Sequence, residues 1–432
     1  MKKNILWRLS RIALSIITID MREKSRQSVR YTVFSHIYEH YENSLFSFVA
    51  PFFAAAFFQP GDNARMGVFY AMATSFAMRP IGAIIFSWIG DKQGRRKALM
   101  YSISLCVFPA ILIAVLPPYE VIGGWASAGL ILVRVLQGIS VGGGFYATLT
   151  LISETDQASK RNLLLGVSLA FGFVGAILGT FSSKFFMNPT FPAYAWRIPF
   201  IIGAIYGIVL FYFKQSVKES HLWEKAEHSH EPVPFFEAVR CHPKNIIAVF
   251  LFGMAILSPF YVVSSWLPGK ITDVFQHHAS DILLVTSTLM AVCGVGIVLC
   301  AWLSTWIKPK LMLSIGCLGL LGCFFVLFNA LSSLDYSMIL TAQYLVTITT
   351  AILSAPAFLM IQKLFPVRYK FSGFAVPFAV GQAVFLGPTP ILCERIVAET
   401  GTIASGSYVL LIALIFIATA TYLAKPQKDI LS

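Results

Sequence analysis

Long apolar runs recur along this chain and are separated by short polar breaks. Uncharged runs such as Asn245–Gly269 and Leu311–Leu334 meet or exceed the about 20 residues that a helix needs to cross the hydrocarbon of a bilayer. They lack the alternation of apolar and polar positions that the strands of a membrane barrel show, whereas a helix satisfies its own backbone hydrogen bonds in lipid. The pattern therefore predicts an all-α membrane protein with twelve transmembrane helices.

The predicted spans fall into two sets of six. The first set comprises Val33–Phe58, Met66–Ile89, Ala98–Leu116, Trp125–Ser153, Asn162–Phe186 and Trp196–Phe213. The second comprises Asn245–Pro268, Ile282–Ile307, Leu311–Leu334, Tyr336–Leu364, Phe371–Cys393 and Thr402–Ala424. Two similar six-helix halves are typical of carriers that bind a substrate between the halves, near the middle of the membrane.

The predicted halves extend over residues 31–213 and 245–424, and three further segments complete the organisation. Residues 214–244 mix acidic and basic side chains and are expected to form a cytoplasmic linker, with a short cytoplasmic tail at 425–432. In residues 1–30, two arginines and other polar side chains fall on one stripe of an apolar stretch, which predicts an amphipathic helix on the inner leaflet. A cleavable signal peptide is the alternative, although the arginines interrupt its apolar region.

Composition and charge agree with a lipid environment. Hydrophobic residues make up 57% of the chain and charged residues 12%, too few to cover a soluble surface of this size. The formal net charge of +13 raises nucleic acid as a partner, but most Lys and Arg residues fall in alternate connections between the predicted spans. By the positive-inside rule, these connections and both termini are cytoplasmic. We therefore expect a multi-pass protein of the cell inner (plasma) membrane with no nucleic-acid partner.

Two acidic residues, Glu39 and Glu42, lie well inside the first predicted span. Burying such groups is costly, so they usually face the interior of a bundle or a cavity, where a carboxyl group can take up and release a proton. Glu42 lies about 13 Å along the helix from its inner end, close to the middle of the membrane. We expect Glu42, and secondarily Glu39, to couple transport to protons. A structural glutamate that stays protonated or paired is the alternative for each.

Arg79 and Arg134 also lie in the middle of predicted spans, where each needs a carboxylate, a carbonyl or a substrate as its partner. Because arginine binds carboxylates with two parallel hydrogen bonds, Arg79 is a candidate for the anionic group of a substrate. Arg134 is a candidate to bind substrate or to tune the acids of the first span. The aromatic residues Tyr41 and Tyr146 could line the same cavity and favour a quaternary ammonium by cation–π contact. Structural pairing and ordinary packing remain the alternatives.

A short histidine motif suggests a different chemistry. His36-Ile-Tyr-Glu39-His40 matches the H-x-x-E-H pattern of one class of zinc enzymes, in which both histidines share a helical face. Patterns of this length arise by chance, and no third ligand cluster is evident, so a metalloenzyme remains a minor alternative. The chain also lacks the G-x-x-x-x-G-K-[ST] motif of ATP-driven proteins. We expect no enzyme activity, no metal and no cofactor, with a proton gradient as the energy source.

Several motifs resemble those of one large family of transporters. Residues 90–97, which read GDKQGRRK, and residues 134–138, which read RVLQG, resemble signatures of the major facilitator superfamily. Arg79-Pro-Ile-Gly, WRIPF at 196–200 and FPVR at 365–368 resemble the metabolite:proton symporter family within it, which includes permeases of proline, betaine and 2-oxoglutarate. The chain departs from that family's E-W-F-D with Glu39-His-Tyr-Glu, and from its G-G-E with GGG at 142–144.

The resemblance implies the major facilitator fold and proton-driven uptake of a small polar metabolite, such as an osmolyte zwitterion or an organic acid. It further implies that Asp91, Arg95 and Arg96, with Glu154, hold one conformation by ion pairs that break as the carrier switches; a simple topology signal is the alternative. The expected partners are this small molecule and the lipid bilayer, and the protein is expected to function as a monomer. An uncoupled facilitator, an exporter of the same fold and a substrate-sensing receptor remain open as alternatives.

Overall fold

The computed structural model describes residues 23–59, 63–154, 161–188, 190–192, 194–213, 217–226, 233–274 and 282–426. Within these ranges every regular element is a helix. The amphipathic helix predicted for residues 1–30 lies outside the described residues, except for 23–30, and so does most of the predicted tail at 425–432.

The first six long helices follow the predicted spans closely. They are α2 (Glu23–Phe57), α3 (Asn63–Gln93), α4 (Arg95–Val115), α6 (Gly124–Ser153), α7 (Arg161–Phe186) and α8 (Ile198–Tyr212), with the 3-10 turn η1 (Ala195–Arg197) before α8 and the short α5 (Tyr119–Ile122) before α6. The largest differences are at helix ends, since hydropathy marks the lipid-facing length of a helix and not its polar extension. α2 begins at Glu23 instead of Val33, and α3 continues beyond Ile89 to Gln93.

The last six spans are also present, but two of them are interrupted. The first of these six spans is interrupted and consists of α11 (Pro243–Ala255), α12 (Ser258–Tyr261), η3 (Val262–Trp266) and α13 (Leu267–Val274). The next three are the continuous helices α14 (Ile282–Leu303), α15 (Pro309–Ser333) and α16 (Tyr336–Ile361). The next consists of η5 (Val367–Tyr369), α17 (Lys370–Gly381), η6 (Gln382–Leu386) and α18 (Thr389–Thr400), and the last of η7 (Ile403–Ser407) and α19 (Tyr408–Leu423).

The interruptions η3 and η6 are π-helical turns, which sequence periodicity did not predict. In η6 the Gly387 N–H donates to the Gln382 carbonyl at 2.8 Å, an i to i+5 hydrogen bond. Pro388 follows directly and has no N–H to continue the α-helical ladder. Such single π turns inside α-helices are frequent at functional sites.

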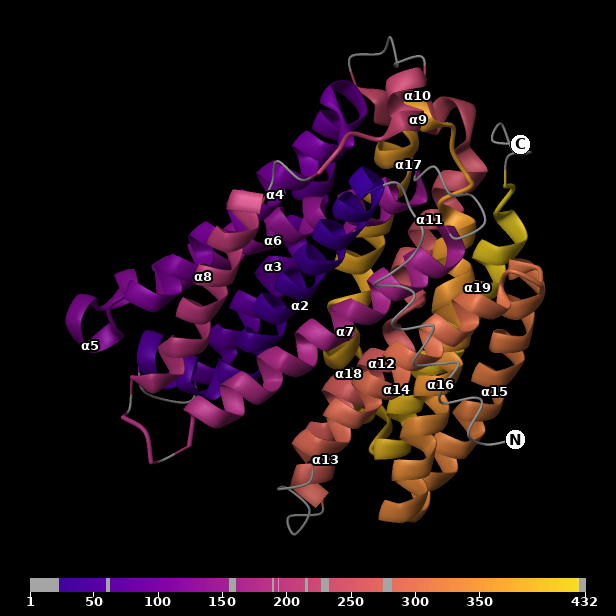
Figure 1. Cartoon of the computed structure of the whole chain (residues 1–432). Helices are drawn as coiled ribbons and strands as arrows, with labels where there is room; N and C mark the ends of the chain where they lie inside the picture. The colour runs from indigo at the N-terminus through magenta and orange to yellow at the C-terminus, as the bar shows by residue number, and fades with distance from the viewer. Residues whose placement is uncertain are drawn as a thin grey trace, which may run out of the picture.

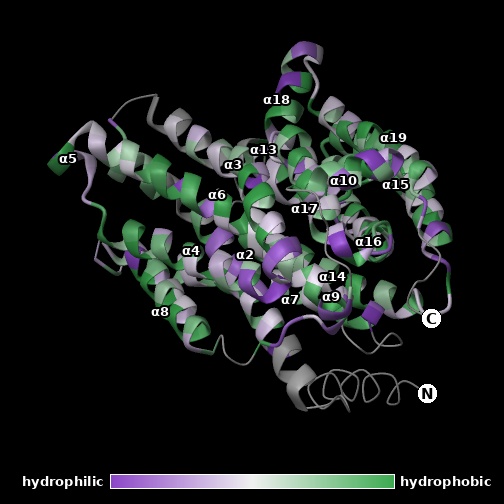
Figure 2. Cartoon of the chain, turned by 90° about the horizontal axis from the view of Figure 1, so that it is seen from above, coloured by the Kyte–Doolittle hydropathy of each residue, from purple (hydrophilic) through white to green (hydrophobic). Residues whose placement is uncertain are grey.

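The helices form two groups, α2–α8 and α11–α19, which is the predicted arrangement of two six-helix halves (Figure 1). Among the described residues, ten helical segments are long and apolar enough to cross a membrane. Together with the long helices α2 and α3, which cover the first two predicted spans, they account for the twelve spans of the prediction. Hydrophobic residues cover the outer sides of both groups (Figure 2), where large apolar side chains such as Tyr212, Val295 and Leu318 are exposed. Lipid satisfies such a surface, so the molecule is a multi-pass membrane protein.

The two groups meet mainly through α7 against α14 and α3 against α17. They are close together at the end where the short helices α9 (His221–Lys225) and α10 (Pro234–Cys241) lie, and they diverge toward the end where α5 and α13 lie (Figure 1). We call these the linker end and the open end. Both short helices belong to the segment predicted as a linker, and the burial of Ala238 shows that α10 packs against the bundle.

Candidate functional site

A cavity of about 200 Å³ lies between the two halves. Helices α2, α3, α6 and α7 line it from one side, and α12, η3, α14 and η6, with Leu257 before α12, line it from the other. Both π-helical turns contribute, through Ser264 and Ser265 of η3 and Gln382 and Leu386 of η6. The cavity therefore occupies the place where a two-half carrier is expected to hold its substrate.

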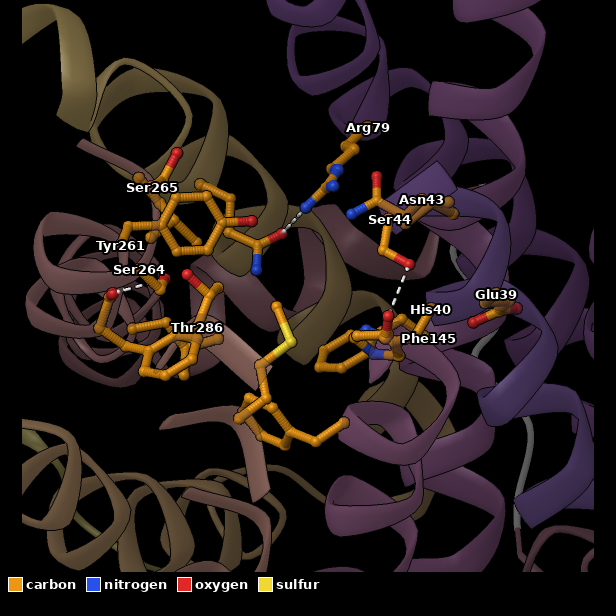
Figure 3. Close-up of a pocket in the computed structure, with 18 of the residues that line it drawn as sticks. Glu39, His40, Asn43, Ser44, Arg79, Phe145, Tyr261, Ser264, Ser265 and Thr286 are labelled. Atoms are coloured by element: carbon orange, nitrogen blue, oxygen red, sulfur yellow. Dashed lines mark hydrogen bonds between the residues drawn. The ribbon is translucent and has the colours of Figure 1, made fainter. Parts of the chain in front are cut away.

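Arg79 of α3 reaches into this cavity, with Tyr261, Ser264 and Ser265 on the opposite side (Figure 3). Its Nη1 donates to the Gln382 Oε1 at 3.2 Å, and its guanidinium lies 3.9 Å from the centroid of the Phe76 ring. Its Nε has no hydrogen-bond partner among the described residues. Arg79 is the only permanently charged cation among the described residues that line the cavity, and it retains an unused donor for an anion.

Glu39 lines the same cavity and is 2% exposed, and neither carboxyl oxygen has a hydrogen-bond partner among the described residues. Its carboxyl group fits against Gly144 of α6, where an added Cβ would lie 1.5 Å from Oε1. The glycine that departs from the family's G-G-E pattern thus leaves the room that Glu39 occupies. A buried carboxyl group without a fixed partner can change its protonation state without breaking a salt bridge.

Glu42 does not line the cavity, although it is only 1% exposed. It faces α8, where an added Cβ at Gly203 would lie 1.7 Å from its Oε1, and neither of its oxygens has a hydrogen-bond partner in the described structure. Arg134 likewise lies inside this half: its Nη1 donates to the Gln137 Oε1 at 2.5 Å, and its guanidinium lies 3.8 Å from the centroid of the Phe46 ring. The structure thus separates the two candidate proton acceptors, with Glu39 in the cavity and Glu42 behind it.

The two candidate tyrosines also take different positions. Tyr146 lines the cavity, and its hydroxyl donates to the Gln382 Oε1 at 2.9 Å. The Tyr41 hydroxyl instead donates to the Pro199 carbonyl at 2.9 Å, which fixes it where α2 packs against α8, outside the cavity lining. Of the four predicted substrate residues, Arg79 and Tyr146 therefore lie at the cavity, whereas Arg134 and Tyr41 do not.

The histidine motif forms a hydrogen-bonded pair. The His40 Nε2 lies 3.1 Å from the His36 Nε2, and the His36 Nδ1 lies 3.2 Å from the Ser168 Oγ. A metal would need further ligands besides this pair. The described part of the chain contains no group of three or more His, Cys, Asp or Glu residues placed to hold a metal ion. His40 also lines the cavity, a role that its spacing of one helical turn from Asn43 and Ser44 could have suggested.

At the linker end, three of the four residues predicted to form a conformational lock lie together, with Arg95 between Asp91 and Glu154. Arg95 is fully buried, and its Nη1 lies 2.7 Å from the Asp91 Oδ1 while its Nη2 lies 3.1 Å from the Glu154 Oε1. The same Nη2 donates to the Val367 carbonyl at 2.5 Å, and the Asp91 Oδ2 accepts from the Ser372 N–H at 2.9 Å. Because Val367 and Ser372 belong to the second half, this cluster connects the halves.

The fourth predicted lock residue, Arg96, participates through its backbone. Glu219, which precedes α9, accepts from the backbone N–H groups of Arg95 at 2.9 Å and Arg96 at 3.3 Å, and so caps the start of α4. Burial raises the pKa of the Glu219 carboxyl group, and the N–H donors act in the opposite direction. At Gly94, φ is +111° and a Cβ would lie 2.1 Å from the Glu219 Oε2, so only glycine fits here. Sequence analysis did not identify Glu219 as part of this cluster.

Comparisons with known proteins agree with this architecture. The sequence pattern of the Major Facilitator Superfamily matches residues 33–388. The chain is 27% identical over 412 residues to a protein of Staphylococcus aureus (strain COL) provisionally named a proline/betaine transporter, covering 93% of this chain and 88% of that one. It is 26% identical over 370 residues to the alpha-ketoglutarate permease of Escherichia coli (strain K12), covering 82% and 83%.

Solved structures show the same fold. The proton:xylose symporter XylE bound to 6-bromo-6-deoxy-D-glucose superposes with a TM-score of 0.75 at 15% sequence identity, covering 91% of this chain and 95% of that one. The inward-open conformation of XylE from E. coli gives a TM-score of 0.65 at 16% identity, covering 94% and 97%. At such low identity the likeness extends to the fold alone.

Proposed function

Because the chain belongs to the major facilitator superfamily and is therefore a membrane transporter, we propose that it takes up a zwitterion with one carboxylate and one ammonium group, coupled to protons. Proline and betaine are the model substrates, in keeping with the name of the Staphylococcus aureus relative. The observation that carries this proposal is the pairing of Arg79 with aromatic and acidic groups in one small cavity.

The charges of the cavity favour a zwitterion over a dicarboxylate. Arg79 is the one guanidinium among the described lining residues and suits a single carboxylate, whereas 2-oxoglutarate carries two. Phe145, Phe173 and Phe260 also line the cavity, and aromatic faces attract a quaternary ammonium by about 0.5–2 kcal/mol each. Glu39 adds a group that repels a second carboxylate when it is ionised. The volume of about 200 Å³ is below the roughly 300–1,000 Å³ of drug-sized pockets and suits a small metabolite.

Glu39 is the first candidate for proton coupling, because it faces the cavity without a hydrogen-bond partner among the described residues. Sequence analysis ranked Glu42 first. Because Glu42 lies inside the first half and outside the cavity lining, it suits a second protonation site. In the proposed cycle Glu39 takes up a proton from the open end while substrate binds to Arg79. The halves then rock, the cluster around Arg95 separates, and release of the proton on the other side accompanies release of substrate.

The linker end is proposed to face the cytoplasm. Basic residues gather there, including Lys92, Arg95, Arg96 and Lys97 in the connection between α3 and α4, and the positive-inside rule assigns such connections to the cytoplasmic side. Hydrogen bonds from Arg95 to Val367 and from Ser372 to Asp91 hold the halves together at this end, so the proposed orientation makes the described conformation closed toward the cytoplasm and divergent toward the outside (Figure 1).

Reconstitution into liposomes tests the proposal. With an acidic exterior, we expect labelled betaine or proline to accumulate above its equilibrium level, and 2-oxoglutarate to remain outside. Glu39→Gln should abolish this accumulation and preserve exchange of labelled for unlabelled substrate, which needs no net proton movement. Equal uptake without a gradient would instead identify a facilitator, binding without uptake a sensor, and preferential uptake of 2-oxoglutarate would refute the zwitterion assignment.

A further inference from the structure

Gln382 lines the cavity and contacts both of the first-half donors there. It is 4% exposed and is the first residue of the π-helical turn η6, in the second half. Its Oε1 accepts hydrogen bonds from two residues of the first half, the Arg79 Nη1 at 3.2 Å and the Tyr146 hydroxyl at 2.9 Å. One amide oxygen thus bridges the two halves at the level of the substrate site.

The partners of this oxygen are those that a carboxylate would seek. A guanidinium and a phenol hydroxyl are both donors here, and together they form a site for an anionic oxygen. A neutral amide satisfies them only in part, because its oxygen carries no formal charge and the Arg79 Nε stays without a partner in the described structure. Hydrogen bonds between ionised groups are roughly twice as strong as neutral ones.

We propose that the Gln382 amide oxygen is a stand-in for the substrate carboxylate and that Gln382 is the residue that selects substrates bearing one. In the empty cavity the amide holds Arg79 and Tyr146 in place. A substrate carboxylate then displaces it and takes over both donors. This proposal rests on the proposed function and extends it by assigning selection to one uncharged side chain.

The neutrality of Gln382 is the central point. Glutamate has nearly the same shape, but its carboxylate would bind Arg79 permanently and cancel the only fixed positive charge among the described lining residues. A carboxylate substrate would then meet repulsion instead of a free guanidinium. The aromatic residues Phe145, Phe173 and Phe260 would remain, so the altered cavity should accept a quaternary ammonium without a carboxylate, such as choline.

The test measures binding of labelled betaine to the purified full-length protein, with choline as competitor. We expect Gln382→Glu to weaken betaine binding by roughly ten- to a hundredfold, the value of a charge-assisted hydrogen bond, and to make choline the better ligand. Gln382→Leu removes the stand-in oxygen without adding a negative charge, so Arg79 keeps its charge and betaine should remain a better ligand than choline. The matched control is Gln362→Glu, because Gln362 is also 4% exposed, lies outside the cavity lining and has no side-chain hydrogen-bond partner in the described structure.

A misfolded protein would not gain choline binding, so this gain in Gln382→Glu distinguishes altered selectivity from loss of the fold. Wild-type betaine affinity in Gln382→Glu, or an equal loss in Gln362→Glu, would overturn the role of Gln382. If the wild type binds 2-oxoglutarate and not betaine, the proposed substrate is wrong. Gln382→Glu must then weaken 2-oxoglutarate binding by the same factor for the stand-in role to hold, so the two failures are distinguishable.

Discussion

Replacing Gly144 by alanine should uncouple transport from protons by displacing Glu39. The new Cβ would lie 1.5 Å from the Glu39 Oε1, 2.6 Å from its Cδ and 2.7 Å from the Ser102 Oγ. Since real Cβ contacts lie beyond about 3 Å, the carboxyl group must move by more than an ångström. Inserting a methyl group into a packed interior costs about 1–3 kcal/mol, which corresponds to roughly a 5- to 150-fold change in the population of the wild-type Glu39 position.

The assay compares two activities of reconstituted protein. Accumulation of labelled betaine driven by an acidic exterior should fall by about the same factor, whereas exchange across equal pH should persist because it needs no proton movement. Gly322→Ala serves as the control, since nothing lies within 4 Å of a Cβ at that position. The double variant Gly144→Ala with Glu39→Asp, whose side chain is one methylene shorter, should recover part of the accumulation. Wild-type accumulation in Gly144→Ala would refute the assignment of Glu39.

Three further outcomes concern the linker end and the cavity. Asp91→Asn removes the charge that pairs with Arg95 at 2.7 Å and leaves Glu154 as the ion-pair partner of this arginine. The change should favour opening of the linker end, because Ser372 of the second half donates to the Asp91 carboxylate and a hydrogen bond to a charged group, worth about 1.5–3 kcal/mol, becomes a weaker neutral one. Labelling of a Ser153→Cys probe, with the exposed Cys241 changed to serine, should accelerate, and an unchanged rate would exclude a locking role. Arg79→Lys should weaken betaine binding about tenfold by losing the two-point contact, measured by equilibrium binding, and unaltered affinity would remove Arg79 from the site. Glu219→Gln should destabilise the start of α4 by about 0.3–1 kcal/mol through weaker interaction with the helix dipole, seen as a lower Tm, and an equal or higher Tm would contradict the capping role.

Contacts between the Arg95 cluster and the second half explain why the two halves are close together at the linker end. Asp91 accepts from Ser372 and Arg95 donates to Val367, so both partners of the ion pair also hold the second half. Any movement that separates the halves at this end must break these bonds together. We expect such a cluster to have two states, closed and separated, as a carrier that alternates between two openings requires.

Sequence reasoning named candidate residues but not how they are grouped. Of these, Arg79, Glu39 and Tyr146 line the cavity, whereas Glu42, which was ranked first for proton coupling, Arg134 and Tyr41 lie outside the cavity lining. The reason is geometric: Glu39 and Glu42 are three residues apart on α2, so their side chains differ by about 60° in direction and by about 4.5 Å along the helix axis. This difference brings them against different neighbours, α6 for Glu39 and α8 for Glu42. A single sequence shows that both acids are buried but not which helix each one faces.

The chain by itself determined the number of spans, their approximate positions and the cost of the charges inside them, because crossing lipid is a local demand that each apolar run meets alone. The tertiary structure decided which of those charges share a cavity, where the π-helical turns fall, and that Gln382 of one half meets Arg79 and Tyr146 of the other. These contacts depend on the rotation of each helix and on how two separate halves dock. Packing between residues about 240 to 300 positions apart sets both, and no local pattern encodes it.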